Sequence, residues 1–255
     1  MSLRTPNPLT NRQTLLDLQR TKERMAILQE QLATGRRIVR LGDDPTGSAL
    51  IVDFKTSIER NEQYRKQIGS ARSYLQASET VLQSLSDGIT RLLELGQQGL
   101  SDTTGASGRP RIAQEVDGLR SNFIALANTQ SDGKYLFAGS RTTTVPFSGP
   151  SSGPILYAGD GASIELDVSI GAMVATNLPG DRVFFGPGGQ GSASDLFQAV
   201  TDLRDALNTN DRALMQTAYD NLKSIHSRIQ DLMTELGGRQ AALDQLEESL
   251  GTFNL

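Results

Sequence analysis

The hydrophobic pattern of the chain is organised around the stretch from Pro45 to about Gly96, which from Ile68 onward carries an apolar repeat of seven residues. A sustained heptad spacing predicts a long amphipathic helix whose narrow apolar edge lies against another helix. A helix of this span would be ~75 Å long, which is typical of fibre subunits rather than of compact enzymes. One heptad position holds Ile68, Leu75, Leu82 and Ile89, and its partner position holds Ala71, Ser78, Leu85 and Leu92.

A shorter and more polar helix is predicted before this rod, over residues 12–34. Its apolar edge is sparse, with Leu18, Met25 and Leu32 seven residues apart. A lone helix of this kind is marginal in water, so we expect it to be mobile until a partner covers it. Gly35 ends it.

The start of the long helix carries its own signals. Asp44 is placed to cap it and Pro45 sits at the first helical position, where a missing N–H costs nothing. We expect interruptions at Gly69 and Gly88. Pro110 then opens a second heptad helix, which should pack antiparallel to the end of the first.

The C-terminal quarter predicts a return to helix. Ser194 or Asp195 caps a short helix, and Asp211 begins a second long rod. The repeat of that rod is still running at Leu255, which predicts that the natural chain continues. Its main heptad position holds Leu222, Ile229, Leu236, Leu243 and Leu250, and its companion position holds Ile225, Leu232, Leu246 and Phe253, with Arg239 as the exception.

Residues 133–191 differ in composition from the helical parts. They are rich in Gly, Pro, Ser and Thr, with short β-branched and aromatic runs bounded by turn residues. The sequence therefore predicts a mainly α fold, an elongated antiparallel coiled coil or helical bundle, with an inserted small β domain. We expect a partly mobile N-terminal segment over 1–41, a discontinuous helical rod domain over 42–132 and 192–255, and the β domain over 133–191. The predicted strands are Lys134–Ala138, Val145–Ser148, Ile155–Ala158, Ile164–Ile170 and Arg182–Phe185.

Composition limits the size of any conventional core. Aromatic residues make up 5% of the 255 residues and there is no Trp, so most burial must come from seams between helices. The net charge of −4 gives no case for nucleic-acid or membrane binding. The charge is uneven, however. Residues 1–40 hold eight Lys/Arg and three Asp/Glu, a net of +5, and residues 195–255 hold five and ten, a net of −5, so the two ends are electrostatic complements.

Candidate chemistry is sparse. The chain has no cysteine, and His226 is its single histidine, next to a seam residue and without a second ligand. The pair Asp43-Asp44 is better interpreted as a helix cap than as catalytic carboxylates. The glycine-rich run 186–191 lacks the Gly-Lys-Ser/Thr ending of a phosphate loop, so it predicts a linker. We therefore expect no catalytic, cofactor-binding or metal site, and no enzyme activity.

The heptad residues have two interpretations. Leu82, Leu85, Ile112, Val116, Leu232 and Leu236 are assigned to an ordinary intramolecular core. The seams at the two ends of the chain are predicted to contact other subunits. The predicted subunit-interface residues are Leu18, Met25, Leu32, Arg36, Arg37, Leu243, Leu246, Leu250 and Phe253.

Two motifs resemble a known family. Thr34-Gly35-Arg36-Arg37-Ile38, followed by residues 43–50 (DDPTGSAL), is similar to the motif near the N-terminus of flagellins and their relatives. Residues 61–68 and Gly133-Lys134-Tyr135-Leu136-Phe137-Ala138-Gly139 resemble the hook-filament junction proteins of that superfamily, the hook-associated proteins of type 3. The resemblance covers most of 12–145 and the final rod.

The resemblance implies a structural, non-enzymatic role in the bacterial flagellum. Proteins of this family join the hook side to the flagellin filament, with a flagellin-like α domain inside the tube and the inserted β domain outside. The implied partners are further copies of the chain in a ring, the first hook-associated protein, flagellin, and an export chaperone that binds a segment beyond Leu255. The implied location is extracellular, after flagellar type III export. Both termini of such proteins are disordered in the monomer and become ordered on assembly.

Two alternatives stay open at this point. The chain is also compatible with flagellin itself, which the Gly133–Gly139 motif argues against. From another class, a secreted coiled-coil adhesin or effector would bind a ligand through its β domain.

Overall fold

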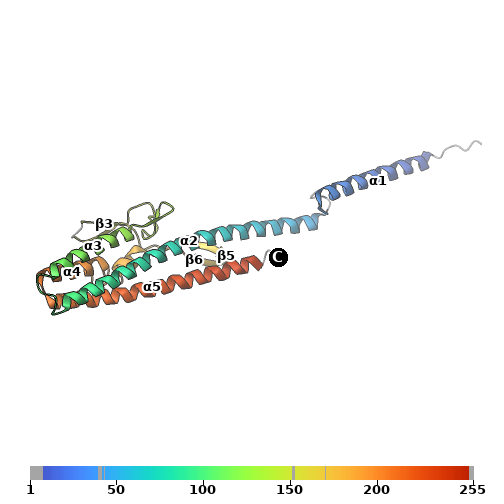
Figure 1. Ribbon diagram of the computed structural model, residues 1–255. Helices are drawn as coiled ribbons and strands as arrows, with labels where there is room; N and C mark the ends of the chain where they lie inside the picture. The colour runs from blue at the N-terminus through green and yellow to red at the C-terminus, as the bar shows by residue number, and fades with distance from the viewer. Residues whose placement is uncertain (1–7, 40–41, 43, 151–152, 170, 253–255) are drawn as a thin grey trace, which may run out of the picture. The chain divides into compact units, whose positions relative to one another are not determined.

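The computed structural model describes residues 8–39, 42, 44–150, 153–169 and 171–252. The chain divides into two compact units, Met1–Arg60 and Asn61–Leu255, and Figure 1 labels the helices α1 to α5 along the chain. The helices are α1 (Pro8–Thr34), α2 (Pro45–Leu100), α3 (Arg109–Ala127), α4 (Leu196–Thr209) and α5 (Arg212–Thr252), with a π-helical turn η1 (Asp181–Phe185). The strands are β1 (Gln130–Ser131), β2 (Lys134–Tyr135), β3 (Phe147–Ser148), β4 (Leu156–Tyr157), β5 (Glu165–Ser169) and β6 (Ala172–Ala175).

The helix ends follow the local signals of the sequence. Gly35 has φ +65° directly after α1, a conformation that glycine adopts without strain. The Asp44 carboxylate accepts a hydrogen bond from the Gly47 N–H at 2.9 Å and so caps α2. Asp195 caps α4 through the N–H groups of Phe197 and Gln198. All three predicted ends are confirmed.

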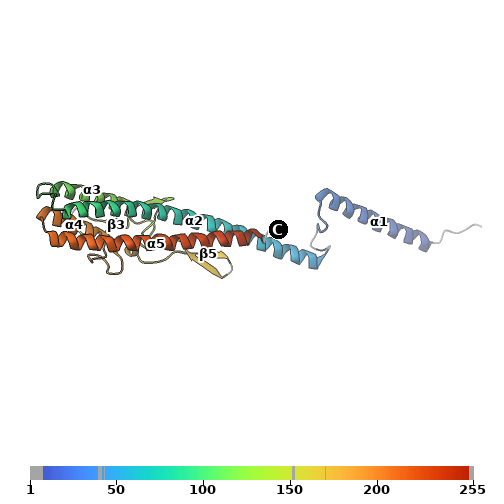
Figure 2. The same cartoon turned by 60° about the horizontal axis from the view of Figure 1, so that its bottom comes forward.

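In the second unit, α5 runs antiparallel to the part of α2 that lies in this unit (Figure 2). The direction is fixed by two contacts far apart along the helices. Arg72 Nη2 lies 2.6 Å from Glu247 Oε2, and Gln230 Nε2 donates to Ser86 Oγ at 2.8 Å. The heptad prediction is confirmed here, because the α2 and α5 seams are buried at Ile68, Ala71, Leu75, Leu82, Leu85, Ile89, Leu92, Leu222, Ile225, Ile229, Leu232 and Leu236.

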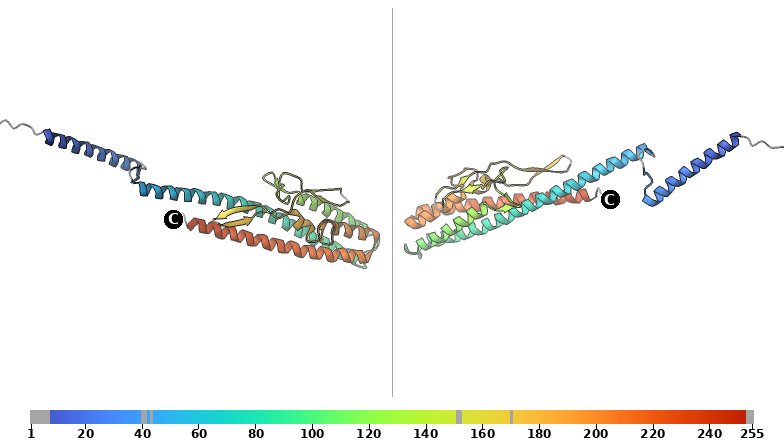
Figure 3. Two further views of the ribbon diagram at one scale, coloured as in Figure 1. Left: turned by 180° about the vertical axis from the view of Figure 1, so that it is seen from behind. Right: turned by 90° about the horizontal axis from the view of Figure 1, so that it is seen from above.

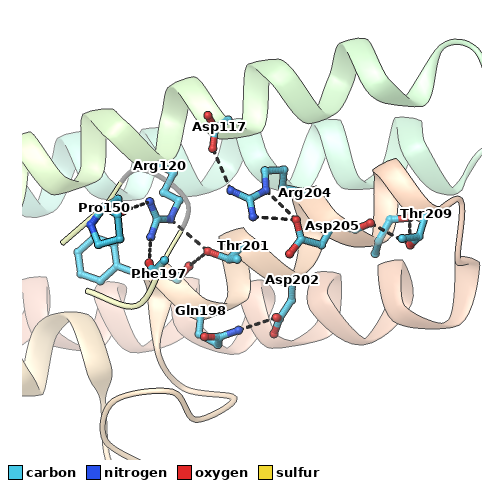
Figure 4. A network of polar contacts seen from close by, with 12 residues as sticks. Asp117, Arg120, Pro150, Phe197, Gln198, Thr201, Asp202, Arg204, Asp205 and Thr209 are labelled. Carbon is cyan, nitrogen blue, oxygen red and sulfur yellow. Dashed lines mark hydrogen bonds and ion pairs between the residues drawn. The ribbon is translucent and has the colours of Figure 1, made fainter. Parts of the chain in front are cut away.

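A second layer is formed by α3 and α4. Arg91 on α2 pairs with Glu115 on α3, and the Arg109 Nε–H donates to the Gly99 carbonyl, so α3 is antiparallel to the end of α2 as predicted. Arg204 on α4 bonds Asp117 on α3 at 3.2 Å (Figure 4). Arg120 on α3 is 1% exposed, and its Nε–H donates to Thr201 Oγ1 at 3.1 Å in the same network (Figure 4).

The long helix α2 continues through both glycines that were expected to interrupt it, so that prediction was wrong. At Gly88, close packing explains why glycine occupies the position, since a Cβ there would overlap the edge of the buried Phe123 ring. The helix at Gly69 is exposed, with nothing within 4 Å of a built Cβ. Tertiary packing along α2 therefore outweighs the low helix propensity of these residues.

These two glycines supply a matched prediction. We expect Gly88→Ala to destabilise the protein by about 2 kcal/mol through overpacking against Phe123, and Gly69→Ala to stabilise it by up to about 1 kcal/mol through helix propensity. Urea unfolding followed by far-ultraviolet circular dichroism gives both values. Equal unfolding midpoints for the two variants would contradict the close contact at Gly88.

The segment between α3 and α4, called the insert below, contains three two-stranded antiparallel sheets, β1–β2, β3–β4 and β5–β6. Four predicted strands are confirmed in shortened form, while β1 and β6 were missed. The prediction of a strand over Arg182–Phe185 was wrong, because these residues form η1, closed by a bond from the Gly186 N–H to the Asp181 carbonyl at 2.9 Å. Val183, Phe184 and Phe185 are consecutive and all buried, and a strand with one solvent face alternates buried and exposed residues instead.

An aromatic cluster joins the insert to the helices. The Phe147 ring lies 4.8 Å from that of Phe184 and 5.7 Å from that of Phe197 on α4, measured between centroids. The Asn128 amide, just after α3, both donates to the Phe147 carbonyl and accepts from the Phe147 N–H. The insert therefore shares its core with the helical layer. On another face, the β5–β6 hairpin lies alongside α5 (Figure 3).

Candidate assembly surface

The apolar edge of α1 is open to solvent. Of the predicted interface residues, Leu18 is 53% exposed, Met25 58% and Leu32 84%. The same helix also exposes Leu15, Leu16, Ile27 and Leu28 by 43–62%. Large apolar side chains exposed along a helix favour an interaction site, because leaving them in water is unfavourable.

Polar bonds connect Arg37, one of the two predicted arginines, to α1 and to the residue that caps α2. Gln31 Nε2 donates to the Arg37 carbonyl at 2.7 Å, and Arg37 Nη2 donates to Asp44 Oδ2 at 3.1 Å. The Gly47 N–H and then the Arg37 guanidinium hold the pKa of Asp44 below its ordinary value. Arg37 therefore pairs with the capping residue of α2 while its side chain remains 77% exposed, and the neighbouring Arg36 is also exposed.

A hollow of about 750 Å³ opens beside this turn. Its apolar lining comes from the turn and from the first turns of α2, and Arg36, Arg37 and Lys55 add three cationic side chains. The cationic rim suits a partner that presents apolar residues among carboxylates. The remaining lining residues are Ile38, Val39, Gly47, Ser48, Leu50, Ile51, Val52 and Phe54.

The first turns of α2 expose large apolar side chains that are not among the predicted interface residues. Leu50 is 53% exposed, Ile51 41%, Phe54 65% and Ile58 48%. For Leu50 and Phe54 the heptad spacing of the sequence was an available signal. Phe54 lies two heptads before Ile68, and Leu50 lies three heptads before Ala71, so both continue the seam. We define the assembly surface as Leu50, Ile51, Phe54 and Ile58 together with Arg36 and Arg37.

The predicted interface residues of the C-terminal rod are placed differently. Leu243 is fully buried and Leu250 is 5% exposed, both in the apolar core of the second unit, and Leu246 is half-buried. In the folded chain Leu243 and Leu250 are not exposed, and their contact with other subunits stays a prediction. The neighbouring contacts come from α2 within the same unit, where Arg72 bonds Asp244 and Glu247. Phe253 lies outside the described residues.

The residues considered for chemistry occupy structural positions. His226 Nε2 lies 3.2 Å from Ser86 Oγ and 3.4 Å from Thr90 Oγ1, between α5 and α2. Asp44 caps α2, while Asp43 lies outside the described residues. Over the described ranges, no group of three or more His, Cys, Asp or Glu side chains is arranged to hold a metal ion. In the same part of the chain, every helix is too short or too polar to span a bilayer.

Comparison with known proteins identifies a matching family, and the similar proteins described below are all flagellar proteins. Residues 9–142 match the family of the bacterial flagellin N-terminal helical region. The flagellar hook-associated protein 3 of Escherichia coli (strain K12) is 28% identical over 242 residues, which is 88% of this chain and 75% of that protein. A flagellar filament 30.7 kDa core protein of Treponema maltophilum is 32% identical, but over 58% of this chain and 52% of that protein.

Solved structures agree on the fold. The flagellar junction protein FlgL from Legionella pneumophila superposes with a TM-score of 0.69 at 19% identity, covering 82% of this chain and 98% of that one. FlgL from Bacillus cereus gives a TM-score of 0.68 at 20% identity, covering 81% and 97%. The fold of a helical layer with a small inserted β part is therefore shared with these proteins.

Proposed function

Since this chain belongs to the family of the bacterial flagellin N-terminal helical region, we propose that it is a structural subunit of the flagellum that forms the junction between hook and filament. The observation that carries this proposal is the extent of the match. Similarity to hook-associated protein 3 runs over 88% of the chain, whereas similarity to the filament core protein runs over 58%. Its relatives are structural flagellar proteins, and the chain is accordingly not an enzyme.

The same proposal includes the binding partners of the chain and its route of export. The chain forms a ring with its own copies, lies between the first hook-associated protein and flagellin, and reaches its extracellular position through the flagellar type III system with the help of an export chaperone. Supporting the self-contacts are the exposed apolar edge of α1 and the assembly surface on α2. The +5 and −5 ends of the chain favour contacts between copies in which unlike ends meet.

The energetics favour assembly on a template over assembly in solution. Ordering a residue costs about 1–2 kcal/mol, so a marginal helix such as α1 gains little by forming alone. Burying its apolar edge contributes about 25 cal/mol per Å². A ring position that already presents the complementary surface offsets the ordering cost, whereas a single encounter in solution does not.

The proposal is tested by deleting the gene from its bacterium and examining the cells by electron microscopy. We expect hooks without filaments, flagellin released into the medium, and full recovery when the gene is restored on a plasmid. A count of subunits per flagellum separates the junction from the filament, since a junction needs a small ring and a filament needs thousands of copies. Normal filaments in the deletion strain would overturn the proposal.

A further inference from the structure

Three side chains of α5 hold the insert on one face of the helix. Arg228 donates to the Ser194 carbonyl at 2.8 Å and to the Val183 carbonyl at 3.1 Å. Glu235, seven residues on, accepts both Nη groups of Arg182, at 3.1 and 2.6 Å. The spacing of seven keeps these two side chains on one face of the helix.

Arg239 is the third of these side chains and the one polar residue on its heptad position. Its Nη1 donates to the carbonyls of Ala175 and Asn177, at 3.0 Å each, at the end of β6. Its Nη2 donates to Glu235 Oε1 at 2.6 Å. Burial raises the pKa of Glu235, but the bonds from Arg182 and Arg239 outweigh it and hold that pKa below its ordinary value. The carboxylate is thus the centre of a charged cluster that includes both the insert and the helix.

Between Glu235 and Arg239 lie two adjacent glycines, Gly237 and Gly238. Both are exposed, and nothing lies within 4 Å of a Cβ built on either, so neither packing nor a positive φ requires glycine here. In a helix interior each glycine favours the unhelical state by about fivefold relative to alanine. The pair is therefore the weakest point in the backbone of this part of α5.

Beyond the glycine pair, α5 is held by a short stretch of seam. Leu243 and Leu250 are buried, Leu246 is half-buried, and Arg72 on α2 bonds Asp244 and Glu247. These ion pairs are partly exposed, so each contributes little. The helical order of residues 239–252 therefore depends more on the contacts of Glu235 and Arg239 at the start of the segment than the order of the centre of α5 does.

We propose that the inserted β part controls the order of the last third of α5. Glu235 and Arg239 bridge the glycine pair and tie the helix on both sides of it to the insert. When this bridge is intact the helix passes straight through Gly237 and Gly238. When it is lost, residues 239–252 unfold locally, separately from the rest of α5, and expose Leu243 and Leu250 to solvent. This coupling goes beyond the junction role and does not depend on it.

Hydrogen exchange of the full-length protein, followed by mass spectrometry, tests the coupling. Glu235→Gln keeps the size of the side chain but removes the charge that both arginines bind. We expect exchange over residues 240–252 to become about fivefold faster, as for loss of a partly exposed ion-pair network, with residues 215–232 unchanged. Glu248→Gln is the matched control, an exposed carboxylate on the same helix, and should leave both segments unchanged.

A second pair of substitutions shows whether the glycines transmit the effect. Gly237→Ala with Gly238→Ala, added to Glu235→Gln, should slow exchange over 240–252 by up to about 25-fold, to the wild-type rate or below it. The proposal is overturned if Glu235→Gln and Glu248→Gln give the same exchange rate over residues 240–252. It is also overturned if Glu235→Gln raises exchange equally over 215–232, or if the two alanines fail to slow exchange over 240–252.

Discussion

Replacing Phe147 with alanine is expected to lower the free energy of unfolding by about 3–5 kcal/mol, the usual cost of emptying a buried aromatic site. The ring is 1% exposed and lies at the centre of the aromatic cluster. Its centroid is 4.8 Å from that of Phe184, 4.9 Å from that of Tyr157 and 5.7 Å from that of Phe197. Because Phe197 belongs to α4, the cavity would weaken the attachment of the insert to the helical layer.

Denaturant unfolding monitored by far-ultraviolet circular dichroism measures the loss. Val145→Ala is a suitable control, because Val145 lies two residues away in the same segment but is 47% exposed. It should change stability by no more than about 0.5 kcal/mol. If the two variants unfold at the same denaturant concentration, the insert does not share a core with α4.

The helices could be predicted well from the sequence because a repeat of seven is visible without knowledge of the partner. The buried positions of α5, from Leu222 to Leu236, all follow from that repeat. Glycine was harder to interpret, since a sequence shows its low helix propensity but not its neighbour. At Gly88 the neighbour is Phe123, from a helix that begins more than twenty residues later.

The insert was predicted less well for a related reason. Its strands are two to five residues long, too short for alternation to identify them. β6 (Ala172–Ala175) contains residues of low β propensity and exists because β5 pairs with it. The run Arg182–Phe185 resembles a strand in composition. In the structure Phe184 and Phe185 both pack against Phe147, and Val183 is buried beside them, which the π-helical turn η1 allows for three consecutive residues.

For the assembly surface, the sequence indicated which edges are apolar but not which of them the chain covers itself. Leu18, Met25 and Leu32 are exposed, while Leu243 and Leu250, with the same heptad spacing, are buried. Their difference depends on whether a second helix of the same chain lies opposite, which is a tertiary property. For the same reason Leu50 and Phe54 were assigned to no surface, although they continue a seam that is closed further along α2.

The largest functional effect is expected from placing charge on that surface. Leu50→Glu combined with Phe54→Glu should leave the fold intact, since both side chains are more than half exposed. On the proposed function it should abolish filament formation, because each carboxylate would have to be desolvated in an apolar contact between subunits, at a cost of several kcal/mol. Motility of a deletion strain carrying the variant on a plasmid, with electron microscopy of its flagella, is the measurement.

Thr56→Glu is the control for added charge. Thr56 is exposed on the same helix and does not line the hollow beside the turn. Filaments should form with this variant, and circular dichroism of the purified proteins should show equal helix content for both. Normal swimming by cells with the Leu50/Phe54 variant would remove this face of α2 from the junction. It would leave the exposed edge of α1 as the surface through which copies meet.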